Sequence, residues 1–240
     1  MRRPEMIIFD YGGTLCYEES WDDLRAEKTL LGYAAGNPGG YSSEDVLRVK
    51  REVFRDVERI YEELGYDVPV RTTNRIVYGY LGIEFSLTER ETERVLWDSI
   101  CECVPVRGIA ELLVFLKGEG IRTGVLSNNG WSSEAIEDKL GAVLPEGGFD
   151  FTFCSSDYLI RKPDPRLFEI ALKKAGLPPE AVWYCGDHFE ADIIGSASAG
   201  LFPVFLDWES DAPRIEEKEG VRFLRIGSPG QLEQYICGLK

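Results

Sequence analysis

The stretch Met6-Ile7-Ile8-Phe9-Asp10-Tyr11-Gly12-Gly13-Thr14-Leu15 decides the fold of this chain. Its first four residues are apolar and predict a short buried strand, with Asp10 at the carboxyl end of that strand. The two glycines that follow allow the chain to turn sharply. A carboxylate in this place can be a nucleophile or a metal ligand. An Asp before two glycines is also common in turns without a catalytic role, so the other segments must decide between these interpretations.

Short runs of β-branched and aromatic residues recur along the chain and alternate with segments of helical length. With the first strand taken as 6–10, further strands are predicted at 122–127, 151–155, 182–185, 203–206 and 221–226. Helices are predicted at 109–117, 133–140, 165–175, 190–199 and 231–237. Alternating strands and helices are typical of a doubly wound parallel sheet, so the predicted fold class is α/β with a Rossmann-like core.

One long segment interrupts this alternation. Between residues 17 and 103 the pattern is almost wholly helical, with apolar residues three or four positions apart at Val46, Val49, Val53, Val57, Ile60 and Leu64. Thr88-Glu89-Arg90-Glu91 has the form of a capping box, in which side chains bind the exposed amides of a helix end. We therefore expect an all-helical cap at 17–103, inserted into a core made of 1–16 and 104–240. The acidic segment 207–220 is expected to be a loop.

The composition limits what the protein can bind. The 240 residues include 27 Lys and Arg against 42 Asp and Glu, a net charge of −15, which opposes binding to nucleic acid and anionic lipid. The first apolar run ends at Asp10, too early for a signal peptide, and no uncharged apolar stretch approaches the roughly 18 residues of a membrane span. A cytoplasmic protein is therefore expected, and its oligomeric state is not predicted. The six cysteines are scattered without the spacing of a zinc site and are expected to be reduced core thiols.

Polar residues follow several of the predicted strands. Ser127 and Asn128 end the second core strand and can donate hydrogen bonds to a phosphoryl oxygen. Lys162 precedes a helix that Pro165 can begin. Asp187 ends a further strand, and Asp192 follows five residues later, a pair of hard oxygen ligands that suits magnesium. In open α/β sheets, ligands bind at the carboxyl ends of the strands, so these groups are expected beside Asp10, in a cleft that faces the cap.

These segments resemble, in order and context, the four motifs of the haloacid dehalogenase-like hydrolase superfamily. The segments that carry the resemblance are Asp10-Tyr11-Gly12-Gly13-Thr14, Ser127-Asn128, Lys162-Pro163, and Gly186-Asp187 with Asp192. The resemblance extends from Ile7 to about Gly200, and the helical insert lies where that superfamily often places a cap.

The resemblance implies a role for each matching residue. Asp10 would attack phosphorus and form an aspartyl-phosphate. Magnesium would be bound by Asp10, by the carbonyl of Gly12 and by Asp187, and Asp192 would bind it directly or hold its water.

The phosphoryl group would have its own set of ligands. Ser127, the amide of Asn128 and Lys162 would bind its oxygens, and Thr14 would brace the loop at the substrate. Positioned donors and a cation stabilise the charge that develops on these oxygens during transfer.

The chain departs from the superfamily pattern at one position. Phosphatases of this superfamily usually carry a second Asp two residues after the nucleophile, which protonates the leaving group and then activates water; here that residue is Gly12. Such general acid–base help typically contributes about 10²–10⁴ in rate. Either the substrate has a good leaving group, such as an acyl or aryl phosphate, or another group supplies the proton: His188, Glu190 or a carboxylate of the cap.

Other chemistries stay open on the sequence alone. Dehalogenases of the superfamily lack that Asp, but they also lack the metal carboxylates that Asp187 and Asp192 provide here. Phosphonate hydrolases have a small residue at that position, keep magnesium and form a Schiff base on a cap lysine. The cap offers Lys28 and Lys50, and Lys50 is expected to be a solvated side chain. A protein that binds a phosphorylated ligand with little turnover is a further alternative.

The resemblance favours a magnesium-dependent phosphohydrolase that acts on a small phosphorylated molecule. The cap would close over the substrate, exclude bulk water and set specificity.

Overall fold

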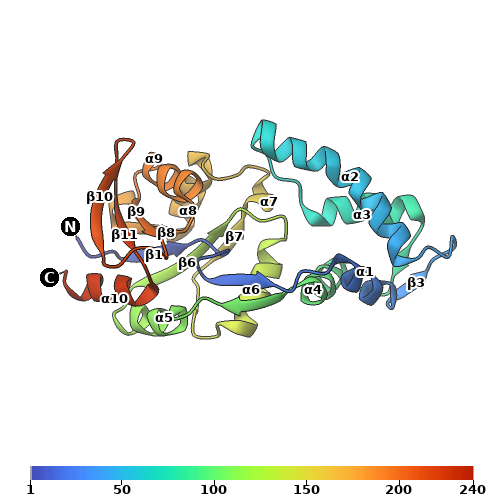
Figure 1. Cartoon of the computed structure of the whole chain (residues 1–240), viewed down its shortest axis with the longest axis horizontal. Helices are drawn as coiled ribbons and strands as arrows, with labels where there is room; N and C mark the ends of the chain where they lie inside the picture. Colours follow the sequence, from blue (N-terminus) through green and yellow to red (C-terminus); the bar gives the residue numbers. More distant parts are fainter. Residues whose placement is uncertain (1, 240) are drawn as a thin grey trace.

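The computed structural model describes residues 2–239, apart from the side chains of Asp56, Glu58 and Glu62, and its centre is a seven-stranded sheet (Figure 1). The strand order is β10-β11-β9-β8-β1-β6-β7. The bounds are β1 Met6–Phe9, β6 Arg122–Ser127, β7 Thr152–Cys154, β8 Val182–Gly186, β9 Phe202–Leu206, β10 Arg214–Lys218 and β11 Val221–Ile226. Every strand is parallel to its neighbours except β10, which runs antiparallel to β11. The predicted α/β fold class is confirmed, and each predicted strand lies within one residue of its expected bounds.

The segment 207–220 is not the loop that the sequence predicted, because it contains β10. This strand pairs with β11 from Arg214, opposite Arg225, to Lys218, opposite Val221. Its one apolar residue, Ile215, packs against the core. The other residues of β10 are charged, a composition that protects the edge strand of a sheet from further pairing.

Helices cover both faces of the sheet, as a doubly wound fold requires. In Figure 1, α5 (Ile109–Gly118) and α10 (Pro229–Cys237) lie below the sheet, and α8 (Pro165–Ala175) and α9 (Gly195–Ser198) lie above it. Alternate residues of β1 enter opposite layers: Ile7 and Phe9 join the layer of α5, α6 (Ser133–Val143) and α10, whereas Met6 and Ile8 join that of α8. The first strand is therefore buried on both faces, which fixes the position of Asp10 at its end.

One predicted core helix is divided. The segment predicted as a helix at 190–199 consists of a π-helical turn, η2 (Phe189–Ile194), followed by the short α9. The remaining connections of the core are α7 (Ser155–Tyr158) and the 3₁₀ turn η1 (Pro179–Ala181).

The inserted segment is mostly helical but not all-helical as predicted, because it contains a short ladder and its two ends lie in strands β2 (Cys16–Glu19) and β5 (Glu102–Pro105). Its helices are α1 (Asp23–Leu31), α2 (Ser43–Leu64), α3 (Val70–Leu81) and α4 (Glu89–Ile100). The capping box at Thr88 is present, with Glu91 N–H bound to the Thr88 hydroxyl and the Glu91 carboxylate bound to Thr88 N–H. The unpredicted ladder pairs β3 (Ala34–Gly36) with β4 (Glu84–Phe85), strands too short to leave a periodic signal. Within residues 2–239, no helix combines the length and hydropathy that a membrane crossing requires.

A two-stranded ribbon joins the insert to the sheet. Strand β2 (Cys16–Glu19) pairs antiparallel with β5 (Glu102–Pro105), and Glu18 lies opposite Cys103. The chain enters the insert after β2 and returns to the α/β part through β5. Residues of the two strands are therefore close to both the end of β1 and the helices of the insert.

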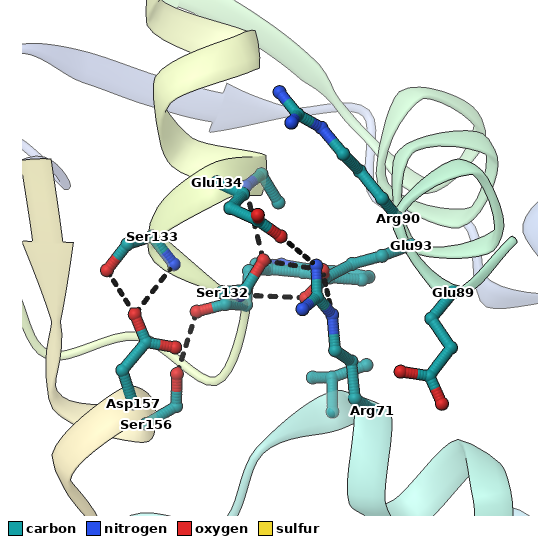
Figure 2. A network of polar contacts seen from close by, with 12 residues as sticks. Arg71, Glu89, Arg90, Glu93, Ser132, Ser133, Glu134, Ser156 and Asp157 are labelled. Carbon is teal, nitrogen blue, oxygen red and sulfur yellow. Dashed lines mark hydrogen bonds and ion pairs between the residues drawn. The ribbon is translucent and has the colours of Figure 1, made fainter.

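Polar contacts also tie α3 and α4 to the start of α6 (Figure 2). The carboxylate of Glu93 is 1% exposed, and it accepts hydrogen bonds from Ser132 N–H at 2.7 Å and from the Ser132 hydroxyl at 2.6 Å. Arg71 Nε donates to the same carboxylate at 2.7 Å, and Arg71 also reaches Glu134 on α6. Arg90 and Asp138 form a second pair between α4 and α6.

A second buried carboxylate, Asp67, makes a similar link from the turn between α2 and α3. It accepts hydrogen bonds from the hydroxyl of Ser155 and from Arg161 Nη1. Ser155 in turn accepts the N–H of Asn129 at 3.0 Å. Asp67 of the insert thus binds the segment before α8 directly through Arg161, and it is linked to the loop after β6 through Ser155.

Most of the cysteines lie where the sequence predicted. Cys16, Cys101, Cys154 and Cys185 are buried, and Cys103 is partly buried. The prediction is wrong for Cys237, which is exposed at the end of α10 because the inward positions of this helix belong to Leu232 and Ile236.

Candidate active site

A cavity of about 500 Å³, which we call the reaction cavity, opens at the carboxyl ends of β1, β6 and β8. Six of the eight predicted site residues are in its wall: Asp10, Gly12, Ser127, Asn128, Lys162 and Asp192. Asp187 adjoins it as part of a cluster with Asp10 and Asp192. Thr14 is fully buried, and its hydroxyl lies 3.5 Å from Asp187 Oδ1, so it contacts the cluster from behind.

The three carboxylates meet because their strands are neighbours. β1 and β8 are adjacent and parallel, and Asp10 N–H donates to the carbonyl of Cys185 at 2.9 Å. One oxygen each from Asp10, Asp187 and Asp192 lies within 4.8 Å of the others. Asp192 reaches this point from η2, where its other oxygen accepts the N–H of His188 at 2.9 Å.

Two glycines make this close approach possible. A Cβ atom on Gly13 would lie 2.0 Å from Asp187 Oδ2, and one on Gly186 would lie 2.3 Å from Asp192 Oδ2. Gly13 also has φ of +70°, a left-handed conformation that side chains rarely adopt. Gly13 therefore leaves the space that the carboxylate of Asp187 occupies, and Gly186 leaves the space that the carboxylate of Asp192 occupies.

Lys162 lies at the centre of the site. Its Nζ is 2.7 Å from Asp10 Oδ1, 2.6 Å from Asp192 Oδ1 and 2.8 Å from the hydroxyl of Tyr184. Tyr184 donates its own hydrogen to the carbonyl of Leu126 at 2.8 Å. Tyr184 is not among the site residues predicted from the sequence. Its signal there is a hydroxyl-bearing residue in an otherwise apolar strand, two positions before Gly186.

The electrostatics of the cluster follow from its burial. Burial raises the pKa of Asp10 to about 7 even though the Lys162 ammonium lowers it, and the nearby charge of Asp192 raises it further. Burial also raises the pKa of Asp187. Burial lowers the pKa of Lys162, but Asp10 and Asp192 outweigh this effect and leave it raised.

This donor set fits a divalent cation. Three carboxylates face one ammonium, so the cluster would carry an excess of negative charge if all three carboxylates were ionised. Hard oxygen ligands of this kind suit Mg²⁺. A bound cation would favour the ionised forms of Asp10 and Asp187, whose pKa values are raised by burial and by the charge of Asp192.

The second motif is bound to the third through a side chain. The side-chain amide of Asn128 donates through Nδ2 to the carbonyl of Lys162 at 2.9 Å, and its Oδ1 accepts the backbone N–H of Lys162 at 2.8 Å. This reciprocal pair holds the lysine loop against the end of β6. Ser127 is 2% exposed and lines the cavity beside them.

Gly12 occupies an open part of the cavity. A Cβ atom there would meet no other atom within 4 Å, and Gly12 is not among the described glycines with positive φ. The position therefore has room for a side chain, and the missing aspartate is not excluded by the backbone.

Four other acidic or basic side chains line the reaction cavity: Glu18, Arg161, His188 and Glu190. His188 is exposed, and its Nδ1 accepts the N–H of Ala191 at 3.1 Å, so the imidazole caps η2. Glu190 is also exposed, on the same turn.

A second cavity of about 540 Å³, the cap cavity, lies between the insert and the sheet. It shares Glu18, Asn128, Asn129 and Arg161 with the reaction cavity. Lys50 lines it, but the expectation of a solvated lysine is wrong: Nζ lies 2.5 Å from Glu27 and 5.0 Å from the centre of the Tyr78 ring. Lys28 is exposed and lines neither cavity.

Comparisons with known proteins agree with this geometry. A family model for haloacid dehalogenase-like hydrolases matches residues 4–200. The chain is 32% identical to glyceraldehyde 3-phosphate phosphatase of Methanothermobacter thermautotrophicus, over 96% of this chain and 98% of that protein. It is 29% identical to the pyrimidine 5'-nucleotidase YjjG of Escherichia coli, over 56% of this chain and 58% of that protein.

A solved structure described as a dehalogenase with an intermediate complex shares the fold, with a TM-score of 0.60, 19% identity and 98% of each chain covered. The family match spans most of the chain and contains every motif residue discussed above. The superfamily predicted from the motifs is thereby confirmed: the chain belongs to the haloacid dehalogenase-like hydrolase family.

Proposed function

We propose that this protein is a magnesium-dependent phosphohydrolase that acts on a small phosphorylated metabolite through an aspartyl-phosphate on Asp10. One observation carries the proposal: the carboxylate of Asp10 lies 2.7 Å from Lys162, among two further carboxylates, in the wall of the reaction cavity. A nucleophile, a phosphate-binding cation and a set of metal ligands would thus meet at one sheet edge. The core would comprise 1–16 and 104–240 and the cap 17–103, and the β2–β5 ribbon that joins them supports this division.

Asp10 would form a bond to phosphorus while the bond from phosphorus to the leaving oxygen breaks. Lys162, bound to Asp10 Oδ1, orients the carboxylate and, with Ser127 and the Asn128 amide, would bind the phosphoryl oxygens. Water would then cleave the acyl phosphate and regenerate Asp10. Bound Mg²⁺, held by Asp10, the Gly12 carbonyl, Asp187 and Asp192, would neutralise the charge of the phosphoryl group.

The relatives suggest which substrates to test first. The relative that matches over the whole length is named for glyceraldehyde 3-phosphate, and the partial match is named for pyrimidine nucleotides. Both are phosphate esters of small polar alcohols, so we take this class as the substrate class of the present enzyme.

The positions of the cap lysines do not favour the phosphonate hydrolase alternative. A Schiff base needs a free amine beside the reacting group. Lys50 is bound to Glu27 in the cap cavity, and Lys28 is exposed outside both cavities.

The test is release of phosphate from matched aryl and alkyl phosphate esters, with and without Mg²⁺. We expect metal-dependent release from both and no turnover in Asp10→Asn. Turnover that persists in Asp10→Asn would refute the nucleophile assignment. Magnesium-dependent binding of phosphate without release from either ester would instead favour the binding-protein alternative.

A further inference from the structure

The wall of the reaction cavity contains a carboxylic acid in a position that the family motifs do not specify. Glu18 lies on β2, two residues beyond Cys16 and on the same face of the strand. Gly12 and Cys16 form an isolated bridge, so β2 begins close to the open space beside Gly12. The strand that begins beside Gly12 therefore carries Glu18 in the wall of the same cavity.

Glu18 is also distinguished by lining two cavities. The reaction cavity is lined by Asp10, Glu18, Glu190 and Asp192, and the cap cavity by Glu18, Asp23, Glu27 and Asp67. Among the acidic residues that the structure describes, Glu18 is the one shared by both lists. A substrate with its phosphoryl group at Asp10 and its leaving group toward the cap would place its scissile bond at this boundary.

One oxygen of Glu18 is fixed and the other is free for chemistry. Trp97 Nε1–H donates to Oε1 at 3.0 Å. Trp97 is 1% exposed and stacks on Trp131, with ring centres 5.1 Å apart and planes at 8°. The carboxyl group is therefore held against a rigid aromatic pair, while the structure gives Oε2 no partner among the described residues.

We propose that Glu18 is the general acid of this enzyme and supplies the proton that the aspartate replaced by Gly12 would otherwise supply. This inference rests on the proposed phosphohydrolase function. The bond from Asp10 to phosphorus forms, the bond from phosphorus to the leaving oxygen breaks, and the leaving oxygen takes the proton of Glu18. In the second half, the Glu18 carboxylate takes a proton from the water that attacks phosphorus, which releases phosphate and Asp10 and restores the acid.

The surroundings of Glu18 support a protonated carboxyl. Burial raises its pKa, and the hydrogen bond from Trp97 and the charge of Lys139 offset this only in part. The other ionisable groups that face it are Tyr11, Cys16, Cys101 and Cys103. An acid whose pKa is raised toward the working pH is better suited to donate a proton.

The other two candidates for the general acid, His188 and Glu190, are placed less well. Both line the reaction cavity but not the cap cavity, so neither lies at the boundary between the two cavities. The Nδ1 atom of His188 is already engaged at the start of η2.

The test compares Glu18→Gln with wild type on an alkyl ester, glyceraldehyde 3-phosphate, and on an aryl ester, p-nitrophenyl phosphate. We expect kcat for the alkyl ester to fall by about 10²–10⁴, the usual contribution of a general acid. The aryl ester, whose leaving group needs no proton, should still release one equivalent of nitrophenol in a rapid first turnover. The basic limb of the wild-type pH profile for the alkyl ester should disappear.

Rescue separates a chemical role from a structural one. Because Gly12 has room for a side chain, Gly12→Asp in the Glu18→Gln background should recover much of the alkyl activity. Glu19→Gln, a change of the neighbouring exposed carboxylate on the same strand, is the matched control and should leave both esters unaffected. Thermal melts of each variant, together with Glu18→Asp, identify any loss that comes from unfolding.

Two negative outcomes are distinguishable. If wild type releases phosphate and Glu18→Gln retains alkyl turnover with an unchanged pH profile, Glu18 is not the acid, and His188→Gln and Glu190→Gln become the next variants. If wild type releases no phosphate from either ester, the proposed function itself fails, and the role of Glu18 fails with it.

Discussion

Glu93 of α4 accepts two hydrogen bonds from Ser132, at 2.7 Å from its backbone N–H and at 2.6 Å from its hydroxyl. Ser132 is the N-cap of α6, and its hydroxyl also accepts the N–H of Ala135. The start of a core helix is therefore held by a carboxylate of the insert. This helix start follows directly on the loop that carries Asn128, a residue of the reaction cavity, so the insert contributes to the shape of that cavity.

The first prediction concerns the stability that this contact provides. Glu93→Ala leaves Arg71 and Ser132 N–H without their buried acceptor and should lower the free energy of unfolding by about 3–5 kcal/mol. Glu89→Ala is the matched control, because Glu89 pairs with Arg75 on the exposed surface and should cost about 0–1 kcal/mol. Denaturant unfolding of both variants provides the measurement. Equal losses would mean that the contact with Ser132 contributes no more than a surface pair.

The second prediction concerns Asp67, which binds both Ser155 and Arg161. Asp67 restrains Asn129 through Ser155, and it binds Arg161, the residue directly before Lys162. Asp67→Asn should therefore disturb both of the loops that we propose bind phosphate and raise KM for a phosphate ester about tenfold, a loss of about 1.4 kcal/mol. Asp98→Asn, which removes another link between insert and core at Lys139, should leave KM unchanged. A rise in KM for both variants would point to general loosening of the cap.

The third prediction uses two adjacent glycines with opposite surroundings. Gly13→Ala places a methyl group 2.0 Å from Asp187 in a left-handed backbone conformation, whereas Gly12→Ala meets no atom within 4 Å. We expect Gly13→Ala to lower the free energy of unfolding by at least about 1–3 kcal/mol and to weaken Mg²⁺ binding. Gly12→Ala should change the unfolding free energy by less than about 1 kcal/mol. A stable Gly13→Ala protein with normal metal affinity would contradict the packing argument.

The sequence predicted the charged centre of the site because parallel strands end at one sheet edge. Asp10, Asp187, Asp192 and Lys162 follow from strand ends and motif order alone. The contacts that hold them do not. The hydroxyl of Ser155 meets Asp67 from 88 positions away, and Tyr184 reads as one more apolar strand residue. Only the packing of the insert on the core shows that such residues share a site.

The strands β3, β4 and β10 were not predicted from the sequence, for a related reason. β10 offers a single apolar residue, Ile215, among charged ones, so its sequence carries no strand period. β3 and β4 are shorter still. Their pairing depends on partners elsewhere in the fold and not on local preference.

The last prediction concerns the pH dependence of stability in the metal-free protein. Burial raises the pKa of Asp10 from 3.8 to about 7, so between these values the folded protein holds a proton that the unfolded chain has released. Stability must then fall as pH rises through this window, by an amount on the order of a few kcal/mol. Asp10→Asn has no such proton to lose and should show a flatter profile. Added Mg²⁺ should reverse the trend in wild type, because the cation binds the ionised carboxylate and its affinity rises as Asp10 deprotonates. Denaturant titrations between pH 4.5 and 8, with EDTA and with Mg²⁺, measure both effects; identical slopes for wild type and Asp10→Asn would show that another group controls the dependence.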